Sequence, residues 1–199
     1  MPRYIAFLRA INVGGHVVKM DQLKRLFEEL GFQNVETFIA SGNVIFETSA
    51  PNAGALERKI ESHLRSALGY EVATFVRSAP ELAAVAGYRP FPDAELDNPE
   101  NTVYIGFLRD GLKEAARAQL AAFQTETYLF HHNNRELYML CRTRFSDSGF
   151  SGAALEKAIG VPTTMRKETT VRKMAAKYPA DTKPATGAPG SAKPSRARR

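Results

Sequence analysis

A short segment near the N-terminus holds residue types that are typical of anion binding. Arg9, Asn12, Gly14, Gly15 and Lys19 lie between a predicted strand and a predicted helix. A glycine-rich turn ahead of a helix can present several backbone N–H groups to a phosphate or carboxylate. An arginine at the end of the strand can donate two parallel hydrogen bonds to the same group. The segment therefore indicates a site for a small anionic ligand at residues 12–15, and this is our leading hypothesis for function.

The same segment also fits a purely structural interpretation. A strand-to-helix turn requires glycine where φ is positive, and Arg9 and Lys19 can then be ordinary solvated charges. A second turn, made by Ser41, Gly42 and Asn43, has the same ambiguity, because glycine and asparagine tolerate the positive φ that tight hairpins need. The sequence alone leaves both interpretations open for both turns.

Other kinds of chemistry lack the residues that they need. The chain has no P-loop, nucleophile-elbow, zinc-protease or paired C-x-x-C motif, so we expect no cofactor and assign no catalytic residue. His131 and His132 are neighbours on a predicted strand and point to opposite faces, so we expect no metal site there. The single cysteine, Cys141, follows an apolar run and is expected to be a buried strand thiol. Whether the protein is an enzyme stays open.

The predicted elements follow the order βαββαβ, the split βαβ plan of ferredoxin-like domains, and the plan then recurs. In the first half we expect strand 4–8, a helix with Asp21 as its N-cap, a hairpin of 35–39 and 44–46, helix 54–68, strand 72–76 and helix 80–86. In the second half we expect strand 104–108, helix 112–123, a hairpin of 128–130 and 137–140, and a last helix over 169–177.

Two sequence repeats support a duplication of this plan. Residues 104–109 lie one hundred positions after residues 4–9, and five of the six residues are identical. Residues 155–159 lie ninety-nine positions after residues 56–60 and match at four of five positions when arginine and lysine are counted as similar. Two matches at nearly the same offset are typical of an internal duplication. We therefore predict an α+β fold of two duplicated ferredoxin-like (split βαβ) halves, each with a mostly antiparallel sheet and helices on one face.

Changes in composition divide the chain into four parts. We expect a first half over residues 1–87, a linker with three prolines over 88–101, and a second half over 102–178. From residue 179 a proline recurs at every fifth position, and no apolar residue larger than alanine or proline appears. Such a segment cannot bury enough surface to offset its loss of conformational entropy. We expect residues 179–199 to form a disordered basic tail.

The charge distribution supplies a rival hypothesis for function. The chain has a net charge of +6, and residues 181–199 hold five basic residues and one acidic residue, a net charge of +4. The remaining +2 leaves residues 1–180 nearly balanced. A basic tail can contact nucleic acid weakly and without sequence preference, because phosphate contacts carry no base information. The rival is therefore a nucleic-acid-associated protein that uses its tail.

The N-terminal residues do not resemble a targeting segment. Arg9 ends the first apolar run before it reaches the length of a signal peptide, and no run approaches the roughly 18 apolar residues of a membrane helix. We expect a cytoplasmic monomer without a membrane segment.

The order and spacing of the N-terminal residues resemble the family called domain of unknown function 1697. The resemblance rests on residues 4–15, 18–20, 23, 30–32 and 41–46, residues 77–78 and 136–138 fit it too, and it covers about residues 3–178. It implies an α+β protein of two similar subdomains with no established activity. The residues that match the family motif are our candidate ligand-binding residues: Arg9, Asn12, Gly14, Gly15, Lys19, Ser41, Gly42, Asn43 and Arg166.

The chain departs from the family pattern near its C-terminus. The family has Asn-Trp-Asn after the arginine that Arg166 matches, whereas this chain has Lys167, Glu168 and Thr169. A tryptophan at that place can pack or stack, and the lysine–glutamate pair cannot replace it. We therefore carry over no role of that segment from the family.

Overall fold

The computed structural model describes residues 1–12, 17–50, 52–143 and 147–180. Every neighbouring pair of strands in its first half is antiparallel, and the strand order is β2-β3-β1-β4. This is the split βαβ arrangement, because β3 lies between β1 and β2. The elements of this half are β1 (Arg3–Leu8), α1 (Met20–Glu28), β2 (Gln33–Thr37), β3 (Asn43–Glu47), α2 (Ala53–Leu68) and β4 (Thr74–Ser78).

The second half repeats this topology. Its sheet has the order β6-β7-β5-β8 and is again antiparallel, so β5 takes the place of β1 and β8 the place of β4. The elements after β4 are α3 (Ala79–Gly87), α4 (Asp93–Leu96), β5 (Thr102–Phe107), α5 (Glu114–Ala122), β6 (Tyr128–Asn133), β7 (Glu136–Cys141), α6 (Gly152–Ile159), β8 (Thr164–Lys167) and α7 (Glu168–Lys177).

Alternation along β1 assigns its residues to two different cores. Tyr4, Ala6 and Leu8 belong to the core that the first sheet forms with α1 and α2. Ile5 and Phe7 point the opposite way and belong to a core shared with the second half. Successive side chains of a strand face opposite sides of the sheet. Because both sides of β1 are buried beyond its first residue, residues 4–8 are apolar without a break.

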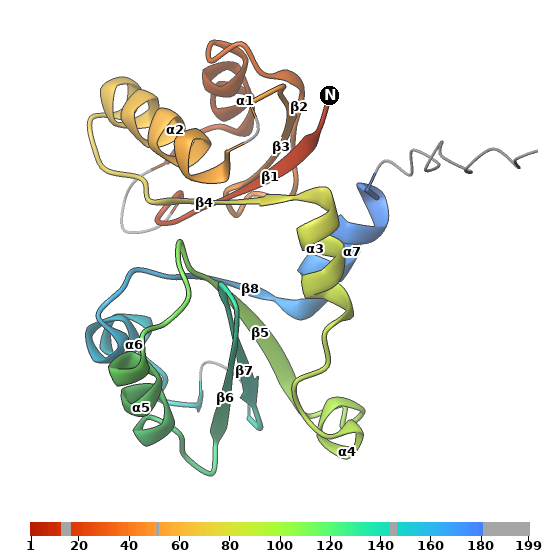
Figure 1. The fold of residues 1–199 in the computed structure, drawn as a ribbon, viewed down its shortest axis with the longest axis vertical. Helices are drawn as coiled ribbons and strands as arrows, with labels where there is room; N and C mark the ends of the chain where they lie inside the picture. The colour runs from red at the N-terminus through yellow and green to blue at the C-terminus, as the bar shows by residue number, and fades with distance from the viewer. Residues whose placement is uncertain (13–16, 51, 144–146, 181–199) are drawn as a thin grey trace, which may run out of the picture.

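The shared core lies between the two sheets, and α3 and α7 lie side by side at its edge (Figure 1). Its central contact joins Phe7 of β1 to Phe107 of β5, whose rings stack with centroids 3.7 Å apart and an interplanar angle of 10°. On the outer faces, α1 and α2 cover the first sheet, and α5 and α6 cover the second. Each sheet thus carries its two helices on one face and meets the other half on the opposite face.

The predicted fold class is confirmed, and the predicted strands and helices lie within about three residues of the observed ones. Cys141 is buried, as expected. The N-cap of α1 is Lys19 and not the expected Asp21. Asp21 lies in the first turn, where a carboxylate interacts favourably with the helix dipole. The expected elements do not include α4 and β8, which are only four residues long each, or α6, which the sequence indicates only through its repeat of residues 56–60.

Two further expectations concern the ends and the surroundings of the fold. The tail, from residue 181 onward, lies outside the described residues, and the division at residues 88–101 stays a prediction. Among the described helices, none combines the length and the apolar character that crossing a membrane requires.

Replacing Gly42 by alanine is expected to lower the free energy of unfolding more than the same change at Gly69. Both glycines have a positive φ, 70° and 80°, so each alanine costs about 1–2 kcal/mol of backbone strain. At Gly42 the added Cβ would also lie 3.2 Å from atoms of Leu8 and Ile11, whereas no atom lies within 4 Å at Gly69. Denaturant unfolding of both variants measures the difference. Equal losses would show that the close approach at Gly42 contributes nothing.

Candidate functional site

Four of the candidate residues come together where the two halves meet. Arg166 of β8 extends into the first half, where its Nε donates a hydrogen bond of 2.6 Å to Oδ1 of Asn43. Its Nη2 donates to the carbonyl oxygens of Leu8, at 2.9 Å, and Gly42, at 3.4 Å. Ser41 completes the group, because its Oγ accepts a hydrogen bond of 2.9 Å from Nδ2 of Asn43. The β2–β3 turn is therefore a receptor for an arginine of the other half.

This arrangement leaves Arg166 little capacity for a ligand. Its Nη1 donates to Oγ1 of Thr164, at 2.8 Å, and to the carbonyl oxygen of Met165, at 2.9 Å. A guanidinium has five N–H groups, and the protein itself supplies five acceptor contacts. The side chain is almost fully buried, and this burial lowers its pKa to about 10, so the group still carries its charge at neutral pH. Arg166 holds the two halves together.

Of the remaining candidates near the first loop, the structure describes Asn12 and Lys19. Oδ1 of Asn12 accepts a hydrogen bond of 2.7 Å from the backbone N–H of Val18, and Nδ2 donates to the carbonyl oxygen of Ala40 at 3.5 Å. Asn12 therefore ties its own loop to the β2–β3 turn. Lys19 is the exposed N-cap of α1 and makes no capping hydrogen bond through its side chain. The two glycines of the motif, Gly14 and Gly15, lie outside the described residues.

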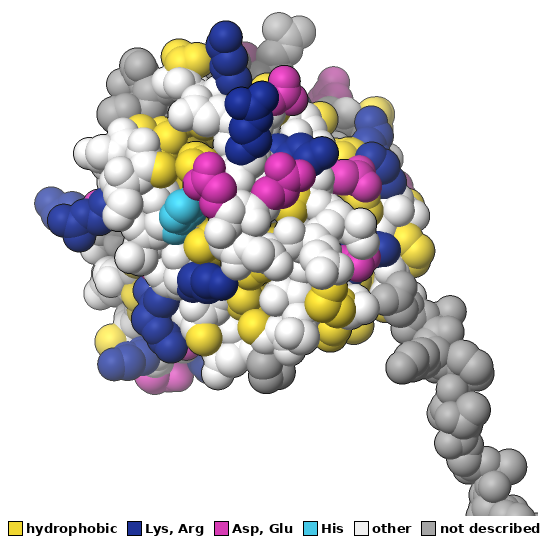
Figure 2. Space-filling view, turned by 90° about the horizontal axis from the view of Figure 1, so that it is seen from above, with side chains coloured by type: hydrophobic (Ala, Val, Ile, Leu, Met, Phe, Trp, Pro, Cys, Tyr) yellow, Lys and Arg dark blue, Asp and Glu magenta, His cyan; other side chains and the backbone are white. Residues whose placement is uncertain are grey.

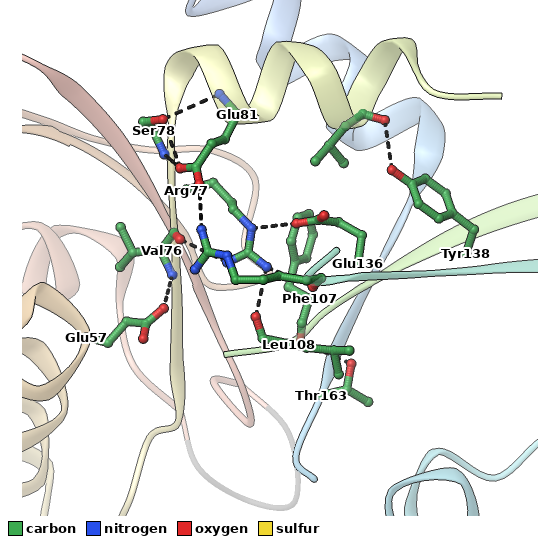
Figure 3. A network of polar contacts seen from close by, with 12 residues as sticks. Glu57, Val76, Arg77, Ser78, Glu81, Phe107, Leu108, Glu136, Tyr138 and Thr163 are labelled. Atoms are coloured by element: carbon green, nitrogen blue, oxygen red, sulfur yellow. Dashed lines mark hydrogen bonds and ion pairs between the residues drawn. The ribbon is translucent and has the colours of Figure 1, made fainter. Parts of the chain in front are cut away.

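A second buried arginine makes the reciprocal crossing (Figure 3). Arg77 of β4 extends into the second half, where its Nε donates a hydrogen bond of 2.6 Å to Oε1 of Glu136. Its Nη2 donates to the carbonyl oxygens of Leu108, at 2.8 Å, and Arg135, at 2.9 Å, and its Nη1 donates to that of Val76, at 2.9 Å. We call Arg77 and Arg166 the crossing arginines.

The crossing arginines occupy equivalent places in the duplicated topology. Each leaves the fourth strand of its half and binds the carbonyl of the leucine that ends, or directly follows, the first strand of the other half. Each also binds two residues at the hairpin of that other half. The equivalent positions are Arg77 and Arg166, Leu108 and Leu8, Arg135 and Gly42, and Glu136 and Asn43.

The crossing arginines also flank the central aromatic contact. The guanidinium carbon of Arg166 lies 5.8 Å from the ring centroid of Phe7, and that of Arg77 lies 5.4 Å from the ring centroid of Phe107. The two rings stack on each other. Cations over aromatic faces are attracted by the ring quadrupole, so the two cations and the two rings form one reciprocal cluster across the interface.

Charge distinguishes the two crossings. Arg77 faces the carboxylate of Glu136, and both side chains are buried, with 1% and 7% of their surface exposed. Arg166 faces the neutral amide of Asn43 at the equivalent place, and no carboxylate of the described residues lies within ion-pair distance of it. One buried charge is therefore compensated by an opposite charge, and the other only by hydrogen bonds.

Arg9 and Arg109, the repeated residues that follow β1 and β5, also reach across the interface. Nη2 of Arg9 lies 2.6 Å from Oε2 of Glu156 on α6. Arg109 pairs with Glu61 and, at 3.5 Å, with Oε2 of Glu57 on α2. Burial raises the pKa of Glu57. Glu57 and Glu156 are equivalent in the sequence repeat, so this pair of contacts is reciprocal too.

Arg9 lines a groove of about 530 Å³ between α2 and Pro162, a residue of the connection from α6 to β8. Two further arginines of α2, Arg58 and Arg65, line the same groove, and both are exposed. They lie seven residues apart, which places them on one face of the helix two turns apart. We call this cavity the Arg9 groove; its other lining residues are Glu61, Ser62, Glu71, Val72, Ala73 and Pro162.

Sequence reasoning found Arg9 but missed Arg58 and Arg65. The helical spacing of seven was visible, but nothing in the sequence shows which face of α2 lies next to Arg9. Within the described part of the chain, no cluster of three or more His, Cys, Asp and Glu side chains could hold a metal ion. His132 instead accepts a hydrogen bond of 3.1 Å from the backbone N–H of Leu112.

Comparison with known proteins identifies a family and a fold. The family model described as a protein of unknown function (DUF1697) matches residues 1–138. A solved structure, that of the conserved bacterial protein SP0830 from Streptococcus pneumoniae, superposes with a TM-score of 0.70 and 21% sequence identity. The similarity covers 89% of this chain and 98% of the other. A similarity at that identity shows the fold alone. Among curated protein sequences, none matches this chain.

The two crossing arginines are expected to differ in how much stability their loss costs. Arg77→Met would leave the carboxylate of Glu136 buried without its cation, which costs about 3–5 kcal/mol. Arg166→Met would leave only neutral acceptors unsatisfied, which costs about 1–3 kcal/mol. Denaturant unfolding of the two variants measures both values.

A second substitution tests the reason for the difference. Adding Glu136→Gln to Arg77→Met removes the unpaired buried carboxylate while keeping the shape of the side chain, so it should restore part of the lost stability. The corresponding control, Asn43→Asp added to Arg166→Met, introduces a buried carboxylate and should lower stability further. Equal losses in both single variants would contradict the role that we assign to the charge of Glu136.

Proposed function

We propose that this chain, which belongs to the DUF1697 family of proteins of unknown function, binds a small anionic ligand in the Arg9 groove. The ligand carries a phosphate or carboxylate group. The observation that carries the proposal is that three arginines, Arg9, Arg58 and Arg65, line one groove of about 530 Å³. Pockets for small molecules have volumes of about 300–1,000 Å³.

The charges of the groove favour an anion. Its lining holds three arginines and two glutamates, a net charge of +1. Both glutamates have cationic partners, since Glu61 pairs with Arg109 and Glu71 lies 3.5 Å from Arg65. Arg58 has no carboxylate within 4.0 Å among the residues that the structure describes. An incoming anion would supply the partner that Arg58 lacks.

A ligand in the groove would compete with Glu156 for Arg9. The side chain of Arg9 is 43% exposed, and its guanidinium forms an ion pair with Glu156 of α6. A ligand bound beside Arg58 would share Arg9 with that carboxylate. The proposed site therefore differs from the expected one at residues 12–15, of which 13–15 lie outside the described residues, and it keeps Arg9. Ser41, Gly42, Asn43 and Arg166 belong instead to the interface between the halves.

The rival function, nucleic-acid binding through the tail, gains no support from the face of the molecule drawn in Figure 2. The face shown in Figure 2 has Lys and Arg side chains interspersed with Asp and Glu side chains, and no continuous basic surface. The tail beyond residue 180 lies outside the described residues. We therefore propose a cytoplasmic, monomeric binding protein for a small anion.

Arg58→Gln is expected to weaken the binding of inorganic phosphate by at least about tenfold, since hydrogen bonds to charged groups contribute about 1.5–3 kcal/mol. Arg25→Gln removes the same charge from an exposed position of α1 outside the groove and should leave binding almost unchanged. Calorimetric titration of the full chain with phosphate and with acetate measures the dissociation constants.

A gain of affinity gives the complementary test. Glu156→Gln should strengthen phosphate binding, because it frees Arg9 while the amide oxygen can still accept the hydrogen bond from the backbone N–H of Thr163. The proposed function is wrong if neither phosphate nor acetate binds to the unmodified chain or to Glu156→Gln. It is also wrong if Arg25→Gln weakens binding as much as Arg58→Gln does.

A further inference from the structure

We propose that the ligand is an amphipathic anion, whose charged group lies in the Arg9 groove and whose apolar part lies in a second cavity beside it. This inference rests on the proposed function, because it uses the Arg9 groove for the charged group. The second cavity has a volume of about 590 Å³ and lies at the start of α5 and the end of α6. We call it the α5–α6 pocket.

The walls of the α5–α6 pocket are mostly apolar. Leu112 and Ile159 are buried beneath it, and Val161 is 37% exposed, an unusual exposure for a large apolar side chain in this protein. The charged side chains of its lining are Arg109, which already pairs with two glutamates of α2, and the exposed Asp110 and Lys113. The remaining lining residues are Gly111, Ala115, Ala116, Gln119, Ala158, Gly160 and Pro162. Such walls suit a hydrocarbon or aryl group better than a charge.

The two cavities are neighbours. Pro162 lines both of them. Arg109 of the α5–α6 pocket pairs with Glu61 of the Arg9 groove, so the two linings share one proline and are joined by one ion pair. A single molecule with a charged end and an apolar end can therefore occupy both, which neither a simple anion nor a neutral hydrocarbon would do.

The duplicated topology explains why the pocket is present in the second half. The connection from β1 to α1 has eleven residues, 9–19, and the connection from β5 to α5 has only six, 108–113. The longer connection places Ile11 and Val18, both 4% exposed, in the core beside α1 and α2. The shorter connection contributes Leu112 to the corresponding core of the second half, besides Leu108, which is the equivalent of Leu8 of β1. Fewer apolar side chains therefore enter the core from the shorter connection, and the pocket lies where this connection meets α5 and α6.

Alkyl phosphates of increasing chain length test the inference on the full chain. Titration with inorganic phosphate and with methyl, butyl and octyl phosphate, each below its micelle concentration, should show tighter binding as the chain grows. Each methylene that enters the pocket should strengthen binding by about fourfold, which corresponds to about 0.8 kcal/mol per buried CH₂. Arg58→Gln should weaken the binding of every compound in the series.

A substitution in the pocket separates the two parts of the ligand. Ala115 lines the pocket and is exposed, so Ala115→Phe can block the pocket without overpacking the core. It should lower the affinity for octyl phosphate to that for inorganic phosphate and leave inorganic phosphate unaffected. Ala118→Phe, on the same helix but outside the lining, is the matched control and should change neither.

The outcomes distinguish this inference from the function on which it rests. If all compounds bind with one affinity that depends on Arg58, the inference is overturned and the proposed function stands. If Ala115→Phe weakens the binding of octyl phosphate but Arg58→Gln does not, the charged group does not lie in the Arg9 groove and the inference is overturned. If vesicles containing phosphatidic acid bind in an Arg58-dependent manner while free octyl phosphate does not, a membrane headgroup replaces the soluble amphiphile. If nothing binds, both the inference and the proposed function fail.

Discussion

The reciprocal exchange of two buried arginines is the constraint on which the rest of this structure depends. Arg77 and Arg166 each leave the fourth strand of one half and satisfy backbone carbonyls of the other half. Between them the rings of Phe7 and Phe107 stack. A buried guanidinium is tolerable only when its N–H groups are satisfied, so neither arginine can keep its place unless the opposite half is also in place. Folding of the two halves is therefore coupled through polar groups as well as through the shared apolar core.

This constraint decides what the family motif residues do. Gly42 and Asn43 lie beside Arg166, and Asn12 is tied to the neighbouring turn, so much of the motif builds the interface. Arg9 is different, because its guanidinium remains partly exposed and lines a groove with two arginines of α2. The motif thus combines residues that hold the halves together with one that lines a cavity, and the residue types alone do not distinguish these two roles.

Much of the fold could be predicted from the sequence, and the reasons are local. A run of aromatic and branched residues marks β1, and the repeat of residues 4–9 at 104–109 correctly identifies β5 as its equivalent. The four residues of β8 form no such run, and only their pairing with β5 makes them a strand. The partner of a long side chain depends on the packing of the two halves. No local pattern could show that Arg166 lies beside Asn43, or that Arg58 and Arg9 line one groove.

The reciprocal contacts have the form of an isologous interface, in which each side gives what it receives. In a homodimer of identical halves, symmetry would force every such contact to occur twice and unchanged. A single continuous chain is free of that requirement, because its two halves can carry different residues at equivalent positions. Glu136 opposite Asn43 is one such difference, and the unequal connections into α1 and α5 are another. Joining the halves in one polypeptide therefore lets one frame present two dissimilar cavities, which a symmetric assembly of the same parts could not do.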